Sequence, residues 1–429
     1  MSEKRVVVVG TTTDYIEEIR TRHPDRAFFV TDPAKRLSAL EPRPAPREEL
    51  LCDLTDFDRV AAALQDGLER RNLKATAVAC FDCESLELAA HLARKLALPF
   101  PSPRAVATCR NKYLAKQLWR HAGIPCPQAV IIRHPAEVTP VMDRFPGPVI
   151  LKPLTGSGSE LVFKCSNARE ASQAFTILQT QLATHPDERM YRPPANGNPA
   201  FDSRRAFLME AFIDGNEFSC DFIVDADHLQ ILRTATKIMA ADQTAGTALA
   251  YVVPGPLVPP WDQNQLSQIL YRAARALDLT RAICMVDFIV HRGTVYLLEL
   301  TPRPGGDCLP PLIHASCGLD MLGLTLDFAA GRPVRIPPES DWKKRVGMRI
   351  LAASAGIVKR IDDRLLQREP AVKSCGFKAH PGYRVKLPPE DYDSRVLGYV
   401  IFEPRPNRQI ASQCAAIRSK LQIEMESNA

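Results

Sequence analysis

The chain has 429 residues, of which 45% are hydrophobic and 24% are charged, and this length and balance predict two or three globular domains. Its net charge of +6 is small and no run of five or more basic residues occurs, which argues against nucleic-acid binding. No apolar stretch reaches the roughly 20 residues that a membrane span needs. The four valines after Arg5 are too few for the apolar part of a signal peptide, so we expect a cytoplasmic protein.

The first hundred residues alternate between strand-like and helix-like patterns. We expect strands at 5–10, 27–32 and 75–82, and helices at 14–23, 56–72 and 85–98. Such alternation predicts a βαβ sheet. A single glycine, Gly10, follows the first strand, so the GxGxxG fingerprint of dinucleotide binding is missing and no NAD site is predicted. A Pro-rich linker at 99–105 closes this unit.

The middle of the chain mixes helices with paired strands. Its expected elements are a helix at 110–123, strands at 147–154 and 160–165 around a Gly/Ser loop, a helix at 167–182, a mobile insertion at 188–205, a hairpin about Asp214–Gly215, a helix at 263–279 and a hairpin about Arg292–Gly293. A third segment begins after 331–338, and its later half is loop-rich and strand-like.

Twelve cysteines are scattered along the chain, mostly in apolar settings, which favours buried, reduced thiols. Cys80 and Cys83 form a CxxC pair, but a structural zinc site needs a second pair nearby and none follows. Metal or redox use of this pair is therefore the minor alternative. His91 and His314 lie in apolar helical patterns and are expected in the core rather than in catalysis.

Two carboxylates are expected to face each other on the second hairpin. If its turn is centred near Arg292–Gly293, Asp287 lies opposite or nearly opposite Glu299, and directly paired residues place their side chains on one face within about 5 Å. Such a pair suits Mg²⁺, which usually takes one or two carboxylates plus phosphate oxygens. Arg303, just beyond the strand, can clamp an anion bidentately. The alternative is a surface hairpin with solvated charges.

Lys152 ends an apolar strand and is followed by the loop Thr155–Ser159, whose backbone N–H groups can wrap phosphate oxygens. This is not a Walker A loop, because there the lysine follows the glycines. An ordinary Gly-rich turn is the alternative. Lys112 stands near the start of a helix.

The segment Met209–Ile213 leads to Glu217. Backbone groups at the end of a strand can hydrogen-bond to the edge of an adenine ring, and a carboxylate can accept hydrogen bonds from ribose hydroxyls.

The order and spacing of these segments resemble the ATP-grasp superfamily, and within it the carboxylate–amine ligases typified by L-amino acid ligases. The segments that carry the resemblance are "RNKYLAKQLWRHAGIPCP", "VILKPLTGSGS", "MEAFIDGNEFSCDF", "MVDFIV" and "YLLELTPRPGGD". It implies an α/β and α+β protein with the ATP-grasp fold, divided into an N-terminal pre-ATP-grasp βαβ domain at 1–103, a nucleotide-binding core at 104–335 with a lid at about 125–210, and a β-rich C-terminal domain at 336–429.

The resemblance also implies roles for individual residues. Phosphates of ATP would be bound by Lys112, Lys152 and the loop residues Gly156, Ser157, Gly158 and Ser159. Adenine would be held by Glu210, Ala211, Phe212 and Ile213, and ribose by Glu217. Mg²⁺ or Mn²⁺ would be held by Asp287 and Glu299, with Thr301 where the family usually has Asn. The substrate carboxylate and the acyl phosphate would be held by Arg303, with help from Lys237 and the Gly305–Gly306 backbone.

The implied reaction activates a carboxylate as an acyl phosphate and joins it to an amine, with release of ADP and phosphate. The alternatives are a bicarbonate-activating carboxylase or carbamoyl-phosphate-type enzyme and a non-catalytic nucleotide-binding module. The expected partners are a small-molecule carboxylate and amine, with no nucleic acid and no membrane; a homodimer is left open. The sequence does not identify the substrates. The resemblance implies that Asp242 and Gln243 lie in a substrate-facing region and that Asp307 is either an amine contact or only a turn residue.

Overall fold

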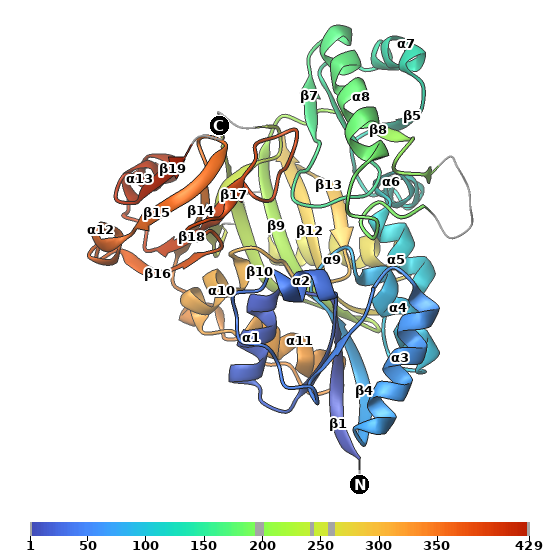
Figure 1. Cartoon of the computed structure of the whole chain (residues 1–429). Coiled ribbons are helices and arrows are strands. Elements are labelled where there is room, and N and C mark those ends of the chain that lie inside the picture. The colour runs from blue at the N-terminus through green and yellow to red at the C-terminus, as the bar shows by residue number, and fades with distance from the viewer. Residues whose placement is uncertain (1, 194–200, 241–243, 256–261, 427–429) are drawn as a thin grey trace.

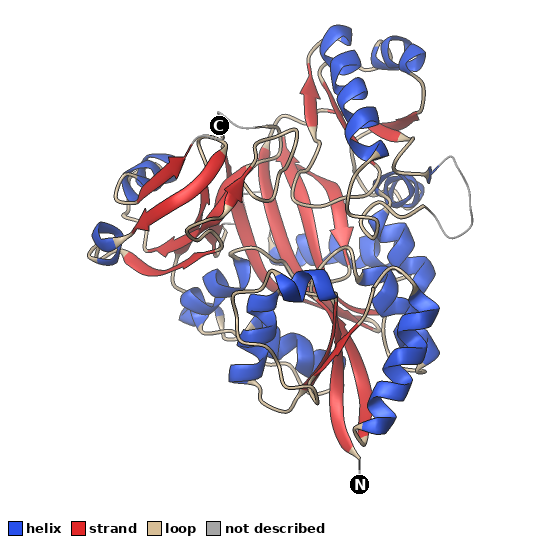
Figure 2. Ribbon diagram, viewed as in Figure 1, coloured by secondary structure: helices blue, strands red, loops and turns tan. Residues whose placement is uncertain are grey.

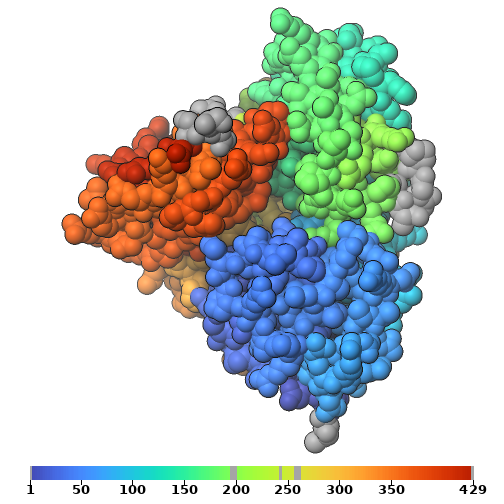
Figure 3. All heavy atoms as spheres, in the orientation of Figure 1, coloured from blue at the N-terminus to red at the C-terminus, as the bar shows by residue number. Residues whose placement is uncertain are grey.

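The computed structural model describes residues 2–193, 201–240, 244–255 and 262–426, and it contains three lobes that meet around a recess (Figures 1 and 3). The N-terminal lobe holds a parallel sheet in the order β3-β2-β1-β4. Its strands are apolar on both faces because helices cover both of them. The elements are β1 (Glu3–Val9), α1 (Thr13–Arg22), β2 (Ala27–Thr31), α2 (Pro33–Leu37), β3 (Glu49–Leu51), α3 (Phe57–Arg70), β4 (Leu73–Cys80) and α4 (Leu86–Lys95).

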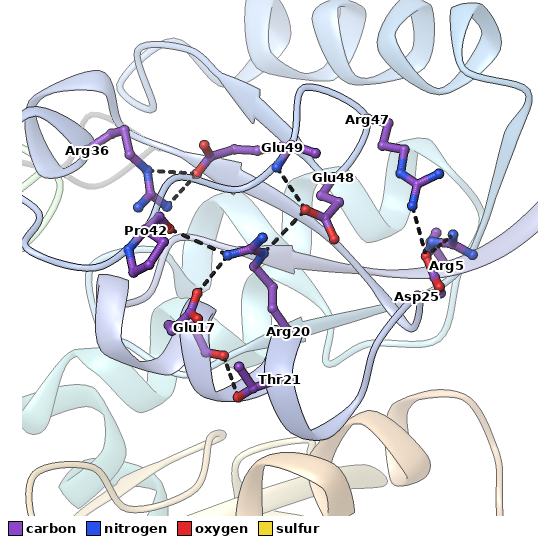
Figure 4. Close-up of polar contacts among 11 residues, drawn as sticks. Arg5, Glu17, Arg20, Thr21, Asp25, Arg36, Pro42, Arg47, Glu48 and Glu49 are labelled. Carbon is purple, nitrogen blue, oxygen red and sulfur yellow. Dashed lines mark hydrogen bonds and ion pairs between the residues drawn. The ribbon is translucent and has the colours of Figure 1, made fainter.

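Ion pairs hold the short edge strand β3 in this lobe (Figure 4). Arg36 of α2 is 3% exposed, and its Nε and Nη2 donate to Glu49 Oε1 at 3.2 and 2.7 Å. Arg20 of α1 donates to Glu48 Oε2 at 3.3 Å. A three-residue strand contributes few ladder bonds, so these contacts supplement the backbone pairing at the edge.

The lid holds an antiparallel sheet in the order β5-β8-β6-β7, with α8 packed against it. Two helices lead into it from the first lobe, and Asn111 caps the second of them by accepting from the N–H groups of Tyr113 and Leu114. The elements are α5 (Pro103–Arg110), α6 (Lys112–His121), β5 (Ala129–Ile132), η1 (Pro135–Glu137), α7 (Val138–Met142), β6 (Val149–Pro153), β7 (Phe163–Cys165), α8 (Ala168–Ala183) and β8 (Phe207–Ala211).

An eight-stranded antiparallel sheet forms the centre, in the order β13-β12-β9-β10-β11-β14-β18-β16. Its last three strands come from the third segment of the sequence, so that segment extends the central sheet. β15, β17 and β19 form a separate three-stranded sheet in the order β17-β15-β19. The elements after β8 are β9 (Asn216–Asp225), β10 (His228–Met239), β11 (Ala248–Val253), α9 (Gln263–Ala276), β12 (Arg281–His291), β13 (Thr294–Thr301), α10 (Leu309–Cys317), α11 (Met321–Ala329), η3 (Glu339–Asp341), β14 (Arg345–Leu351), β15 (Gly356–Asp362), α12 (Arg364–Gln367), β16 (Val372–Phe377), β17 (Arg384–Val385), β18 (Val396–Phe402), α13 (Ile410–Arg418) and β19 (Gln422–Glu426).

Several sequence expectations are corrected here. No hairpin forms about Asp214–Gly215, because β8 pairs within the lid sheet and β9 within the central sheet. At Gly215 a Cβ atom would lie 2.3 Å from the Val290 carbonyl oxygen, so the crossing needs glycine. The strand expected at 160–165 is reduced to β7, since the Gly/Ser loop continues through its first residues.

The insertion expected to be mobile at 188–205 is partly packed into the core: Tyr191 is 0% exposed and Ser203 is 1% exposed. Residues 194–200 of that segment lie outside the described residues. His314 was expected in the core and is exposed, whereas His91 is half-buried with Nε2 3.2 Å from Asp58 Oδ1. The helix period places His314 on the solvent side of α10, since the apolar face is supplied by Leu309, Leu312 and Ile313.

Among the described residues, no single helix has both the length and the apolarity to cross a bilayer. The helices α10 and α11 meet that test only when they are taken together, and they are bent by 101° at the break between them.

A buried ion pair lies on one face of the central sheet, where the side chains change from charged to apolar along the strands. Odd-numbered residues of β9 point to this face, and Asp221 there forms an ion pair with Arg233 of β10, both side chains being 0% exposed. Arg233 Nε and Nη2 donate to the two carboxylate oxygens at 3.0 Å each, and Asp221 Oδ1 also accepts from Gly305 N–H at 3.1 Å. This bidentate pair therefore anchors the loop that follows β13.

We expect Asp221→Ala to lower the free energy of unfolding by about 3–5 kcal/mol, because it leaves the Arg233 guanidinium buried without a carboxylate. Urea denaturation monitored by circular dichroism measures the change. Asp225→Ala on the same strand is the matched control: Asp225 is exposed, and its loss should cost less than about 0.5 kcal/mol. Equal, small losses in both variants would contradict the anchoring role.

Candidate active site

A cavity of about 440 Å³ lies between the lid sheet and the central sheet, within the usual range for small-molecule sites. Its walls come from β6 and β8 on one side and from β10, β12 and β13 on the other, with the Gly/Ser loop and residues 244–247 at its rim. The residues predicted from the sequence that line it are Lys112, Lys152, Gly156, Ser157, Ser159, Glu210, Ala211, Phe212, Ile213, Glu217, Lys237, Asp287 and Glu299.

The cavity has an apolar part and a charged part. Ile150 and Phe212 from the lid side and Ile289 and Leu298 from the central sheet supply apolar lining. Lys164 lies over the Phe212 ring, with Nζ 3.8 Å from the ring centroid. The charged lining consists of lysines and carboxylates, namely Lys112, Lys152, Lys164, Lys237, Glu160, Glu210, Glu217, Asp287 and Glu299. Such a cavity is suited to a molecule with a flat apolar portion and an anionic tail.

Two lysines enter the cavity from different walls. Lys112 is the first residue of α6, and its Nζ lies 3.2 Å from Glu299 Oε2 and donates to the Gly156 carbonyl at 3.0 Å. Lys152 of β6 is 7% exposed and its Nζ lies 2.5 Å from Glu210 Oε1. Both lysines lie where the sequence predicted, each paired with a carboxylate of the chain.

The Gly/Ser loop lies over the cavity and is tied to the opposite rim. Gly156 and Gly158 have φ of +114° and +66°, values that favour glycine. Ser159 Oγ donates to the Gly246 carbonyl at 2.7 Å, and this contact crosses from the lid to the central sheet. Gly158 itself is absent from the lining, but its neighbours Ser157 and Ser159 are part of it. The loop can therefore cover whatever lies beneath it.

The expected carboxylate pair is present: Asp287 is the direct partner of Glu299 across β12 and β13, next to a bulge. The turn of this hairpin, Arg292–Gly293, has positive φ at both residues. Lys237 of β10 joins the pair, with Nζ 2.6 Å from Asp287 Oδ2 and 2.7 Å from Glu217 Oε1. Three carboxylates thus lie on the adjacent strands β13, β12 and β9, and Lys237 on β10 pairs with two of them.

Burial raises the pKa of Asp287 to about 6, and the nearby charges of Glu299 and Glu217 add to this effect while Lys237 opposes it. Burial also disfavours the charged form of Glu299, but Lys112 and Lys152 outweigh it and lower its pKa to about 2. The facing carboxylates of Asp287 and Glu299 therefore repel each other, and a further cation beside them would reduce this repulsion.

A divalent cation fits these residues. Asp287 Oδ1 is buried, and within the described part of the chain it has no hydrogen-bond partner. It lies beside Glu299, so the pair offers an orphaned oxygen and a second carboxylate, which is the donor set that Mg²⁺ takes together with phosphate and water oxygens. Thr301 follows two residues later on the same face of β13, and its hydroxyl is a weaker potential ligand.

Arg303 lies beyond the end of β13, outside the cavity lining. Its Nε and Nη2 lie 3.1 and 3.0 Å from the Sγ atom of Cys83, at the end of the N-terminal sheet. Gly306 is adjacent, since a Cβ atom there would lie 3.8 Å from Arg303 Nη1. Arg303 thus faces the N-terminal lobe, and its fork of donors is directed at a thiol.

The cysteines agree with the expectation of reduced thiols: all twelve are free, and each is buried or half-buried. Cys80 contacts the Asp82 carbonyl and Cys83 contacts Arg303, so the two thiols of the CxxC pair have different partners. No cluster of three or more His, Cys, Asp or Glu side chains suited to a metal ion occurs in the part of the chain that the structure describes.

The backbone of Gly305 was expected to help stabilise an oxyanion, and the structure contradicts this. Its N–H donates to Asp221 within the buried ion pair. Asp307 has Oδ2 2.9 Å from Arg349 Nε on β14, so its carboxylate already has a partner. Asp242 and Gln243 lie outside the described residues.

Sequence reasoning missed two charged groups that support the site. Asp221 interrupts the apolar run "FSCDFIV", and an acid inside a buried strand was an available signal. Lys116 is 0% exposed and lies one helical turn after Lys112, between the core residues Ala115 and Trp119. Its place on the apolar face of α6 was the corresponding signal.

Comparison with known proteins identifies the central part of the chain. Residues 145–311 match the ATP-grasp domain family. A protein from Sinorhizobium fredii described as uncharacterized is 25% identical over 313 residues, which cover 72% of this chain and 60% of that protein. D-alanine–D-alanine ligase from Ralstonia nicotianae is 27% identical over 251 residues, which cover 56% of this chain and 68% of that enzyme.

The fold as a whole is also found in solved structures. The L-amino acid ligase from Bacillus licheniformis superposes with a TM-score of 0.76 at 16% identity, and the match covers 100% of both chains. The parallel N-terminal sheet and the large antiparallel sheet agree with the α/β and α+β fold expected from the sequence. Residues 145–311 therefore match the ATP-grasp domain family, and the chain as a whole has the fold of that L-amino acid ligase structure.

Proposed function

We propose that this protein is an ATP- and Mg²⁺-dependent ligase that activates a carboxylate as an acyl phosphate and joins it to an amine. The observation that carries the proposal is the cavity between the two sheets, in which the Asp287–Glu299 pair, Lys112 and Lys152 lie together beneath the Gly/Ser loop. The names of two similar proteins, an L-amino acid ligase and a D-alanine–D-alanine ligase, support the same class of reaction.

In this proposal ATP lies along the cavity. Adenine occupies the apolar part between Ile150 and Leu298, against Glu210 and the backbone of Ala211–Ile213. Glu217 accepts the ribose hydroxyls. The phosphates lie between Lys112 and Lys152, where the N–H groups of the loop can reach them.

Asp287 and Glu299 would hold Mg²⁺, which when bound neutralises phosphate charge and orients the γ-phosphoryl group. Thr301 is a candidate for a further contact to the metal or to its water. Lys237 already lies between Asp287 and Glu217, so it can supply positive charge at the same place. The lysines offset only part of the negative charge of the carboxylates and the phosphate chain, so the proposed site requires Mg²⁺ as well.

A carboxylate reacts poorly with an amine, because direct amide formation would require an oxide ion to leave. A carboxylate oxygen attacks the γ-phosphorus, ADP leaves, and an acyl phosphate forms. The amine nitrogen then attacks the acyl carbon, phosphate leaves, and the nitrogen releases a proton. We assign Arg303 to the substrate carboxylate and to the acyl phosphate, with Gly306 beside it, because its guanidinium lies just past the metal-binding strand.

Water must be kept from the acyl phosphate, and the Gly/Ser loop provides the cover. Its Ser159–Gly246 bond closes one rim of the cavity. The loop must open to admit ATP, so this hydrogen bond is expected to break and re-form in each cycle. The same cover lowers the local dielectric and strengthens the lysine–phosphate attraction.

The reaction is tested by incubating the protein with ATP, Mg²⁺ and a panel of amino acids. We expect ADP and phosphate to form only when amino acids are present, and mass spectrometry should find a product equal to two substrates less one water. Bicarbonate-dependent ADP formation would point instead to a carboxylase, and ATP binding without any ADP would overturn the proposed catalysis.

Replacing Asp287 by Asn should lower kcat/KM for amino-acid-dependent ADP formation by roughly 100-fold or more, because one of the two carboxylates proposed for the metal is lost. The ratio of rates is measured at several Mg²⁺ concentrations, and part of the loss should be recovered at high Mg²⁺. Asp225→Asn, an exposed carboxylate of the neighbouring strand, is the control and should leave the rate unchanged. A variant at 287 with near-normal activity would remove Asp287 from the site.

A further inference from the structure

The cover of the cavity has two parts that meet along one rim. The Gly/Ser loop lies on the lid side, and residues 244–247, between β10 and β11, lie on the side of the central sheet. The second part contains a turn, because Thr247 N–H donates to the Thr244 carbonyl at 3.1 Å. The Ser159–Gly246 hydrogen bond joins the two parts, so a firm seal requires that both of them are held in place.

Arg395 of the C-terminal lobe holds the turn at 244–247. This residue directly precedes β18 and is 1% exposed. Its Nη1 donates to Thr244 Oγ1 at 3.2 Å, and its Nη2 donates to Thr247 Oγ1 at 3.0 Å. Its backbone carbonyl accepts from Ala352 N–H at 2.8 Å, which fixes it to the end of β14. Both threonines line the cavity, so the guanidinium supports the rim from outside the lining.

Tyr392, three residues earlier, packs on the lid side of the same rim. It is 5% exposed and belongs to a buried cluster whose other members include Leu161, Met190 and Tyr191 of the lid. Leu161 comes only two residues after Ser159 of the Gly/Ser loop. In Figure 3 the orange C-terminal lobe accordingly touches the green lid beside the recess. The lid therefore closes onto the C-terminal lobe as well as onto the central sheet.

Tyr392 and Arg395 belong to one short, well-fixed turn. Arg395 Nε donates to the Tyr392 carbonyl at 3.2 Å, and the guanidinium carbon lies 5.2 Å from the centroid of the tyrosine ring. Asp391 Oδ1 accepts from the N–H groups of Asp393 and Ser394 at 2.8 and 3.2 Å, which fixes the backbone between the two larger side chains. Together these five residues form what we call the C-terminal clasp, with one side chain in the lid core and another on the rim of the central sheet.

We propose that Arg395 and Tyr392 of the C-terminal clasp are positioning residues for the ligase reaction, which hold both parts of the cover together and keep water from the acyl phosphate. This inference rests on the proposed function, in which an acyl phosphate forms next to the phosphate end of the cavity. When the cover is loose, the oxygen of a water molecule bonds to the acyl carbon and the bond from that carbon to the phosphate oxygen breaks. Phosphate leaves with the electron pair, a proton passes to solvent, and the carboxylate is regenerated. The net result is ATP hydrolysis without amide formation.

A purely structural role for the clasp gives a different result. If Arg395 only stabilises the C-terminal lobe, its loss lowers the amount of active enzyme, and phosphate release and amide formation fall by the same factor. The ratio of phosphate released to amide formed then stays at its wild-type value. If the clasp keeps the cover shut, that ratio rises. The ratio therefore separates the two roles, whatever happens to the absolute rate.

The test measures this ratio for wild type, Arg395→Met and Arg384→Met with ATP, Mg²⁺ and the same panel of amino acids. Phosphate is followed by a colorimetric assay and the amide product by mass spectrometry. Methionine keeps part of the apolar stem of arginine but donates no hydrogen bond. Arg384, an exposed arginine of β17 in the same lobe, is the matched control. We expect Arg395→Met to raise the ratio by roughly 5-fold or more, and Arg384→Met to leave it unchanged.

Thr247→Val provides a second route if Arg395→Met does not fold. Valine has nearly the shape of threonine but offers no oxygen to Arg395, so this variant should raise the ratio as well. An unchanged ratio in the folded variants would overturn the proposal. Excess phosphate that forms equally without amino acids would also overturn it, because water would then be attacking ATP rather than an acyl phosphate. A wild type that forms no amide at all would refute the proposed function itself, which is a separate outcome.

Discussion

The repulsion between Asp287 and Glu299 is the constraint on which the rest of the site depends. Their strands pair directly, so the two carboxylates cannot separate, and burial makes the repulsion costly. Lys237 and Lys112 each approach one member of the pair. The lid and the Gly/Ser loop place lysines next to this pair and, in the proposed function, a phosphate chain as well. A cation bound there would offset the negative charge of the two carboxylates.

Buried charges elsewhere in the molecule serve to hold these groups in position. The Asp221–Arg233 pair anchors the loop that begins with Arg303, and Lys116 joins Glu210 to the opposite wall. Neither pair is accessible to solvent. Apolar residues of similar volume would often be no less stable at such positions, so the value of these pairs lies in fixing the geometry of neighbouring polar groups. Both occur where two segments distant in sequence meet.

The ligase proposal places the two halves of the reaction in different lobes. Nucleotide and metal belong between the lid and the central sheet, whereas Arg303 faces Cys83 of the N-terminal lobe. The substrates must therefore enter at the junction of all three lobes, near the recess visible in Figure 3. Variation of the residues at that junction can change the substrates without disturbing the phosphate and metal groups.

Local pattern determined much of this protein. Alternating strands and helices predict the N-terminal sheet, and the two-residue turn at Arg292–Gly293 sets the hairpin register as far as Phe288 and Leu297. That register alone would place Asp287 opposite Leu298, and the bulge at Leu298 brings Glu299 opposite Asp287 instead. The tertiary structure alone decided which sheet each strand joins, so the expected hairpin at Asp214–Gly215 became a crossing between sheets. It also decided the partners of Lys116, Gly305 and Arg303, since contacts between distant segments leave no periodic trace in the sequence.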